Sequence, residues 1–300
     1  MPLVSIIVPC HLSSRAQAAL LDETLSTVDA QTIDDYEVIV VDDGSPIAVA
    51  PVVVSHPRTM TVLQPNGGSA VARNTGIGRS TGRFLVFLDA DDHLLPHALE
   101  AGLTGLAEEP ACGFTVGGRE EMTFDGARLP HTAAPPLEGR QPIYVPLLGF
   151  EWFIMPPSMA MFRREIVEAV GGFQDPWGAD DLDFYLRVAL RSDAWCHKTL
   201  VTRYRRYSTS SSRDGERMLR SVRAVYDRHR ALAEDHPAVR RAFDNGLAQL
   251  TEIFRDCLLE NVKDRLCSGD AAGAQRASAL LAAESPQRWA RLAGRWSTVD

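Results

Sequence analysis

The sequence predicts an α/β fold, with a mostly parallel central sheet flanked by helices and a small helical region at the C-terminal end. Three observations lead to this prediction. Short apolar runs rich in β-branched residues alternate with helix-like segments through the first hundred residues. Polar loops follow these runs, and from about Glu216 onward the chain is rich in Ala, Leu and Arg with helical periodicity. Strands that alternate with helices are typical of parallel sheets with right-handed crossovers.

The elements follow in order along the chain. Continuous apolar runs, typical of strands buried on both faces, span residues 3–8, 37–41, 59–63 and 83–88, with helix-like segments at 17–30 and 68–79. Residues 107–149 contain many Pro and Gly, so we expect loops and a short hairpin there. Residues 158–173 read as a strand and then a helix that ends at Gly171 and Gly172. Residues 180–192 have helical spacing with acidic residues at the start, where the helix dipole favours them.

Composition limits the classes of function. The 300 residues suffice for one large or two modest domains, and 45% hydrophobic residues allow a sizeable core. The formal net charge of -8 argues against nucleic acid as a partner, because binding to its phosphates needs a basic surface. Five scattered cysteines without a C-x-x-C pair favour reduced thiols. No apolar run approaches the ~18 residues of a membrane span, so we expect a cytoplasmic protein whose contact with membranes is at most peripheral.

Four polar loops follow the four predicted strands of the first half. They are PCHLS at 9–13, DDGSP at 42–46, QPNGGSAVARN at 64–74 and DADD at 89–92. Each loop alone could be an ordinary turn, since Asp, Gly, Ser and Asn favour turns. Ligands of open parallel sheets bind beyond the carboxyl ends of the strands, so we expect the four loops to meet at one edge and to form a site.

The aspartates of DADD are the strongest indication of chemistry. Asp89 and Asp91 follow an apolar strand, where like charges are costly unless a cation lies among them. Carboxylate oxygens suit Mg²⁺ or Mn²⁺, which completes its shell from water and substrate phosphates. The alternative is an acidic turn in solvent. In the preceding loop, glycine N–H groups and Arg73 could hold an anion, or the loop is flexible and ends in an N-cap at Ser69.

Two further acidic stretches allow two interpretations each. Asp42 and Asp43 form either a strand-end turn or a nucleoside site, in which a carboxylate accepts hydrogen bonds from a base or a ribose. Asp180 and Asp181, after Trp177, are either favourable charges at a helix start or the surroundings of a general base. In the second interpretation Asp181 is the base, and Trp177 is a platform on which a sugar or ring stacks.

Taken together, several stretches resemble glycosyltransferase family two, the inverting enzymes of GT-A fold. They are VSIIVPCH, AQTIDDYEVIVVDDGS, NGGSAVARNTGI, TGRFLVFLDADD and GGFQDPWGADDLDFYLRVA, and the resemblance covers about residues 3–212. It implies a nucleoside-diphosphate sugar donor, which we expect to be UDP-linked, a divalent cation (Mn²⁺ or Mg²⁺), and direct displacement by a hydroxyl or amine of a saccharide, lipid-linked, protein or small-metabolite acceptor. We expect a catalytic domain at 1–212, with a nucleotide-binding half (1–105) and an acceptor-binding half (106–212), and a helical extension at 213–300 that could form a homodimer.

The resemblance also implies roles for individual residues. The donor-binding residues would be Pro9, His11, Asp42, Asp43, Gly67, Arg73, Asp89 and Ala90. The cation would be bound by Asp91 together with Asp89, and the general base would be Asp181. The acceptor-binding residues would be Trp152, Trp177 and Asp180.

The chain departs from the family pattern at three positions. Asp180 replaces the usual Glu, and His11 stands where Asn is common. Tyr207 stands where relatives often have a His that joins the metal, so phosphate contacts are expected instead from among Arg205, Arg206 and Ser211. Two other functions stay open, a nucleotide-sugar-binding helper protein without transfer activity and a sugar nucleotidyltransferase. The second normally has a glycine-rich loop after the first strand, which PCHLSSR lacks.

Overall fold

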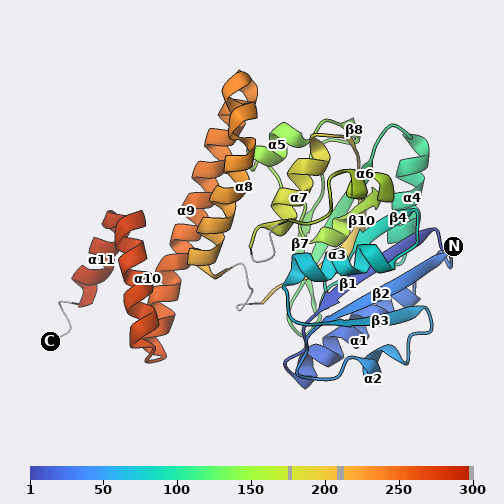
Figure 1. The fold of residues 1–300 in the computed structure, drawn as a ribbon, viewed down its shortest axis with the longest axis horizontal. Coiled ribbons are helices and arrows are strands. Elements are labelled where there is room, and N and C mark those ends of the chain that lie inside the picture. The colour runs from blue at the N-terminus through green and yellow to red at the C-terminus, as the bar shows by residue number, and fades with distance from the viewer. Residues whose placement is uncertain (175–177, 208–212, 297–300) are drawn as a thin grey trace. The chain divides into compact units, whose positions relative to one another are not determined.

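The structure, a computed structural model, describes residues 1–174, 178–207 and 213–296 (Figure 1). Its strands are β1 (Val4–Cys10), β2 (Tyr36–Asp43), β3 (Thr59–Gln64), β4 (Phe84–Phe87), β5 (His93–Leu94), β6 (Phe114–Met122), β7 (Arg128–Ala133), β8 (Gly139–Gln141), β9 (Ala160–Arg163) and β10 (Ala194–Arg205). Its helices are α1 (Arg15–Asp29), α2 (Ala50–Val53), α3 (Ser69–Arg79), α4 (Ala98–Glu108), α5 (Tyr144–Leu148), the 3₁₀ helix η1 (Pro157–Met159), α6 (Arg164–Ala169), α7 (Asp180–Ala189), α8 (Gly215–Asp235), α9 (Pro237–Cys267), α10 (Ala271–Glu284) and α11 (Pro286–Trp296). The chain divides into two compact units, one of residues 1–147 and 152–207 and one of residues 148–151 with the chain beyond 207.

The strands of the first unit form one sheet in the order β3-β2-β1-β4-β9-β6-β10-β5, with β7 beside β6 and β8 beside β10. Strands β1 to β4 are parallel to one another, and β6 is parallel to β10. Strand β9 is antiparallel to both β4 and β6, so these two groups run in the same direction. The predicted mostly parallel sheet is therefore confirmed, and most strands have their carboxyl ends at one edge.

The apolar runs form strands because both faces of the sheet are covered. Ile6, Val38 and Val40 pack with residues of α1 and α4 in one buried cluster. Their chain neighbours Ile39 and Val41 pack with Ala72 of α3 on the opposite face. The strand β3 differs from this expectation, because it lies at the edge of the sheet and none of its residues is fully buried.

The prediction for residues 107–149 is wrong in one part. A hairpin does form there, between β6 and β7, but β6 is a fully buried strand inside the sheet and not a loop. Its sequence includes Arg119, Glu120 and Glu121, which are unusual in a buried strand. Their charges are paired: Glu120 lies 2.7 Å from Arg128 and 2.6 Å from Arg203, and Arg119 lies 3.1 Å from Glu121. Paired charges are tolerated in the interior where isolated ones are not.

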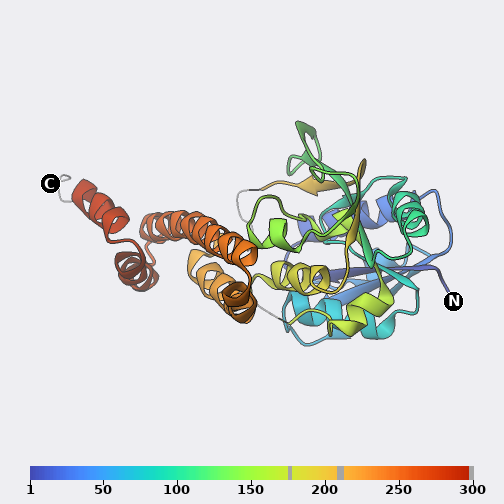
Figure 2. The same ribbon diagram turned by 90° about the horizontal axis from the view of Figure 1, so that it is seen from above.

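The second unit confirms the predicted helical C-terminal region. Its long helices α8 and α9 run side by side, as Figures 1 and 2 both show. Asp214 and Asp270 cap α8 and α10 by accepting backbone N–H bonds from Arg217 and Gly273, at 3.1 and 2.9 Å. In the parts of the chain that the structure describes, no helix is long and apolar enough to cross a membrane. All five cysteines are free thiols.

Candidate active site

The loops after β1, β2, β3 and β4 meet at one edge of the sheet, as predicted. The backbone N–H of Leu12 donates to the Ser45 hydroxyl at 2.8 Å. The Nδ1 atom of His11 lies 2.9 Å from the carbonyl oxygen of Asp43 and 3.1 Å from Nδ2 of Asn66. His11 therefore lies among three of the four loops, where the resemblance implies a donor contact.

The aspartates after β2 shape these loops. Asp43 accepts hydrogen bonds from the backbone N–H of Gly67 at 2.8 Å and of Gly68 at 2.9 Å, and from the Gln64 amide at 2.7 Å. Both of its oxygens are thus engaged within the chain, which gives Asp43 a structural role that the sequence did not suggest. Asp42 is buried, and one of its oxygens accepts from the backbone N–H of Ser45 at 2.9 Å.

Two glycines are required for this arrangement. Gly44 has a φ of +72°, and a Cβ atom there would lie 2.9 Å from the backbone nitrogen of Asn66. Gly68, with a φ of +89°, is the N-cap residue of α3. The alternative interpretation of this loop, with an N-cap at Ser69, is therefore wrong by one residue, since Ser69 is the first residue of α3. Its hydroxyl donates to Asp180 at 3.2 Å.

Arg73 connects the loop after β4 to the start of α7. Its Nη1 atom lies 2.5 Å from an oxygen of Asp180, and its Nη2 atom lies 2.8 Å from an oxygen of Asp89. The guanidinium is buried and lies over the ring of Phe173, 5.2 Å from the centroid. A predicted donor-binding residue and a predicted acceptor-binding residue therefore form one ion pair.

Asp181 is half-buried in the first turn of α7. Burial raises its pKa to about 7, and the neighbouring Asp180 carboxylate contributes to the rise. One Asp181 oxygen accepts from the backbone N–H of Leu182 at 2.7 Å. A carboxyl group with a pKa near neutral pH is suited to act as a general base.

The turn after β4 concentrates three carboxyl groups. Burial and then repulsion from Asp89 raise the pKa of Asp91 to about 7. Asp92 is buried and its pKa is also raised by burial, and its Oδ2 atom has no hydrogen-bond partner among the described residues. Crowded carboxyl oxygens with incomplete partners fit a hard divalent cation. Within the described parts of the chain, no three His, Cys, Asp or Glu side chains gather closely enough to hold an ion alone, so Asp89 and Asp91 would supply part of its shell.

The structure places the remaining candidates as follows. Pro9 on β1 and Ala90 in the acidic turn are both half-buried. Trp152 is half-buried in the loop before η1. Trp177 and Ser211 lie outside the described residues. The acceptor-binding role of both tryptophans stays a prediction.

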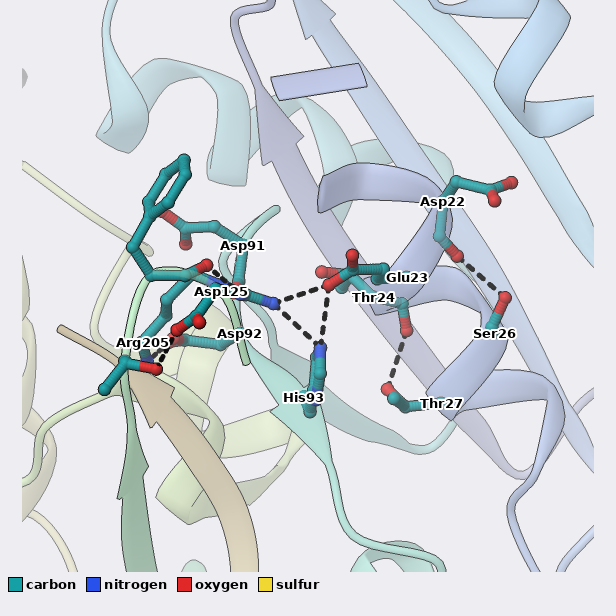
Figure 3. Close-up of polar contacts among 12 residues, drawn as sticks. Asp22, Glu23, Thr24, Ser26, Thr27, Asp91, Asp92, His93, Asp125 and Arg205 are labelled. Atoms are coloured by element: carbon teal, nitrogen blue, oxygen red, sulfur yellow. Dashed lines mark hydrogen bonds and ion pairs between the residues drawn. The ribbon is translucent and has the colours of Figure 1, made fainter. Parts of the chain in front are cut away.

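The predicted phosphate contact of Arg205 is wrong, because its guanidinium is buried within the chain. It binds Glu23 at 2.8 Å and the carbonyl oxygens of Asp91 and Phe124 at 2.8 and 2.6 Å (Figure 3). Tyr207, at the position expected for a metal-binding His, packs edge-on against the ring of Phe124 at 6.0 Å between centroids.

Three residues that contact the candidate site were not assigned to it from the sequence, namely Glu23, Ser69 and Phe173. Glu23 lies on α1, far from every motif, and no sequence signal marks it. Ser69 adjoins the glycines of the loop after β3, and its contact with Asp180 spans 111 positions of sequence. Phe173 directly follows Gly171 and Gly172, where the helix was predicted to end. Only its position under the Arg73 guanidinium shows that it contacts the site.

The chain matches the protein family described as glycosyl transferase family 2 over residues 5–171. Its relatives include the uncharacterized glycosyltransferase EpsJ of Bacillus subtilis, 29% identical over 178 residues that cover 56% of this chain and 49% of EpsJ. The uncharacterized protein MT1568 of Mycobacterium tuberculosis is 28% identical over 247 residues, which cover 77% of this chain and 75% of MT1568. The chain thus spans about half the length of the first of these relatives and three quarters of the second.

Two solved structures share the fold. One is TarS 1-349 of S. aureus in complex with UDP-GlcNAc, with a TM-score of 0.59 at 15% identity, covering 91% of this chain and 90% of that one. The other is the mannosyltransferase PcManGT of Pyrobaculum calidifontis in complex with GDP-Man and Mn²⁺, with a TM-score of 0.58 at 21% identity, covering 99% and 80%. These likenesses confirm the GT-A fold. Because the family match extends over more than half of its residues, the chain belongs to glycosyl transferase family 2.

Proposed function

We propose that the protein is an inverting glycosyltransferase that moves a sugar from a nucleoside-diphosphate sugar to a hydroxyl or amine acceptor by direct displacement. The observation that carries the proposal is the Arg73 bridge. It holds Asp180, the neighbour of the base candidate Asp181, and Asp89 of the acidic turn on the same guanidinium. This arrangement supports a single site in which Asp181 is the base for the acceptor and Asp89 is part of the anchor for the donor. Family membership favours this function over a nucleotidyltransferase.

The proposed donor is a UDP-sugar. The loops around His11, Asp42 and Gly67 form the edge at which nucleotides bind in open α/β sheets. TarS was solved with UDP-GlcNAc and PcManGT with GDP-Man, which supports a sugar nucleotide and leaves the base to be measured.

Asp89 and Asp91 are the residues that would hold a divalent cation. Such an ion, when bound, would stabilise the negative charge that develops on the leaving diphosphate. The presence of Mn²⁺ in PcManGT supports this assignment. Arg73 orients Asp89, since it pairs with one oxygen of that carboxylate at 2.8 Å.

In the proposed reaction Asp181 takes the proton from the acceptor hydroxyl or amine. The freed electron pair forms a bond to the anomeric carbon from the face opposite the diphosphate, while the bond to the diphosphate oxygen breaks. The transition state resembles an oxocarbenium ion, as it does in the hydrolysis of glycosides. The anomeric configuration is inverted.

The test is a panel of sugar nucleotides with Mn²⁺ and a set of candidate acceptors, with product mass spectrometry. Release of nucleoside diphosphate with a glycosylated product supports a transferase. Pyrophosphate would indicate a nucleotidyltransferase, and binding without turnover would indicate a helper protein. Loss of activity in EDTA, restored by Mn²⁺ or Mg²⁺, would support the role of the cation, whereas insensitivity to EDTA would contradict it.

Asp181→Asn tests the assignment of the base. We expect kcat to fall about 10³-fold, within the usual contribution of a general base, while the dissociation constant of the donor changes less than about threefold. Asp193→Asn is the control, because Asp193 pairs with Arg140 on the surface, away from these loops. Near-normal transfer by a folded Asp181→Asn protein would show that another group takes the proton.

A further inference from the structure

Arg205, the last residue of β10, is held inside the protein although it carries a charge. Only 2% of its surface is exposed. Its guanidinium donates from Nε to the carbonyl oxygen of Asp91 at 2.8 Å, from Nη1 to that of Phe124 at 2.6 Å, and from Nη2 to the Glu23 carboxylate at 2.8 Å. Figure 3 shows this side chain between the acidic turn and α1.

The same residue also binds the turn through its backbone. The N–H of Arg205 donates to an oxygen of Asp92 at 2.8 Å. Asp91 and Asp92 are thus held by one residue, one through its carbonyl oxygen and the other through its side chain. Two such attachments on either side of one peptide bond restrict the rotation of that peptide. The direction in which the Asp91 side chain leaves the backbone is restricted with it.

The anchor itself is rigid. A guanidinium is planar, and its donors have a fixed geometry that suits several acceptors at once. Here the acceptors come from α1, the acidic turn and the β6–β7 hairpin. Arg73 contacts the other end of the turn at Asp89, so two buried arginines hold the two aspartates of the D-x-D pattern from separate sides.

We propose that Arg205 is a positioning residue for the divalent cation. Arg205 sets the spacing of the Asp89 and Asp91 carboxylates and does not contact the ion. The inference rests on the proposed function in one respect, namely that these two aspartates bind the cation. Residues that orient metal ligands typically contribute 10- to 100-fold to metal affinity. The energetic effect should therefore fall on metal binding more than on the chemical step.

The experiment compares Arg205→Lys with Arg203→Lys. Both replace a β10 arginine that binds a carboxylate, but Arg203 contacts Glu120 and not the turn. Binding of Mn²⁺ is measured directly from the EPR signal of the free ion, with UDP present, and kcat is measured against Mn²⁺ concentration. A lysine ammonium cannot reach the three separated acceptors at once, so we expect Arg205→Lys to bind Mn²⁺ about tenfold more weakly. Its kcat at saturating Mn²⁺ should stay within about threefold of wild type, and Arg203→Lys should match wild type in both.

Equal Mn²⁺ affinity in Arg205→Lys and wild type would overturn the inference, as would an equal loss in Arg203→Lys. If Arg205→Lys does not fold, Glu23→Gln replaces it, because this change weakens the far anchor of the guanidinium and, besides it, the 3.7 Å contact of Glu23 with His93. A two- to fivefold loss of Mn²⁺ affinity in Glu23→Gln would then support the inference, and an unchanged affinity would overturn it. Failure of wild-type protein to bind Mn²⁺ with any nucleotide would instead overturn the cation's part in the proposed function, and this inference with it.

Discussion

Replacing Arg73 by Met should destabilise the first unit strongly. The methionine side chain can keep the apolar contact with Phe173, but it leaves Asp180 and Asp89 without their shared cation. Asp180 is buried, whereas about a third of Asp89 is exposed, so Asp180 carries most of the cost. Removing one partner of a buried ion pair typically costs about 3–5 kcal/mol, because the other charge stays buried and unpaired.

The loss should depend on pH in a defined direction. Burial raises the pKa of Asp180 above its ordinary 3.8, and Arg73 opposes that rise. Without the arginine the folded-state pKa rises further. A carboxyl group with a raised folded pKa destabilises the fold above its unfolded pKa, and this penalty fades as pH falls through the folded value. The deficit of Arg73→Met should therefore be largest at pH 8 and smaller at pH 5.

The assay is urea unfolding at both pH values, followed by far-UV circular dichroism and tryptophan fluorescence. Arg140→Met is the matched control, since its pair with Asp193 is half exposed and should be worth at most about 1 kcal/mol. The double change Arg73→Met with Asp180→Asn should recover part of the loss, because it removes one unpaired charge. A deficit below about 1 kcal/mol at pH 8, or one that is equal at pH 5 and pH 8, would refute the reasoning.

Three further outcomes are expected. Because burial raises the pKa of Asp181 to about 7, kcat/KM should rise with pH by about tenfold per unit and level off above about pH 7. A flat profile between pH 5.5 and 8 would contradict the assigned base. Gly44→Ala should cost about 1–3 kcal/mol in urea unfolding, because its backbone is left-handed and the new Cβ would crowd Asn66, and an unchanged midpoint would show that the loop relaxes freely. Asp43→Ala should lower the free energy of unfolding by about 2–4 kcal/mol and weaken UDP binding in calorimetry, because three donors lose their acceptor. Unchanged UDP affinity would show that donor binding does not depend on the shape that Asp43 gives this loop.

The first half of the fold could be predicted because its signals are local. The strands β1, β2 and β4 are apolar runs, and the loop after each contains turn-forming residues. The convergence of these loops followed from the rule that parallel strands end at a common edge. The acidic turn and Asp181 were found in the same way, since carboxyl groups after a buried strand or at a helix start need an explanation.

The rest depended on partners far away in sequence. The strand β6 was expected to be a loop because the stretch around it is rich in Pro and Gly, and one sequence does not show that Glu120 also pairs with Arg203, 83 positions later. Arg205 was expected to meet phosphate because a basic residue near a site often does. Its actual acceptors lie 81 to 182 positions away, and one sequence cannot reveal such distances.

The reversed strand β9 determines where this protein can be altered by exchange of segments. Since β9 is antiparallel to β4 and β6, the chain leaves β6 and enters β9 at the same edge of the sheet. Residues 123–159 therefore begin and end at the same edge of the sheet. The rule of right-handed crossovers concerns connections between parallel strands, so it does not apply to this one. A longer segment inserted in the exposed stretch 136–138, between β7 and β8, would keep both strands and the Phe124 carbonyl oxygen that binds Arg205. The strand order and the acidic turn would then stay unchanged. This exposed stretch is where inserted segments can be tested for altered acceptor preference while the proposed donor-binding loops are kept.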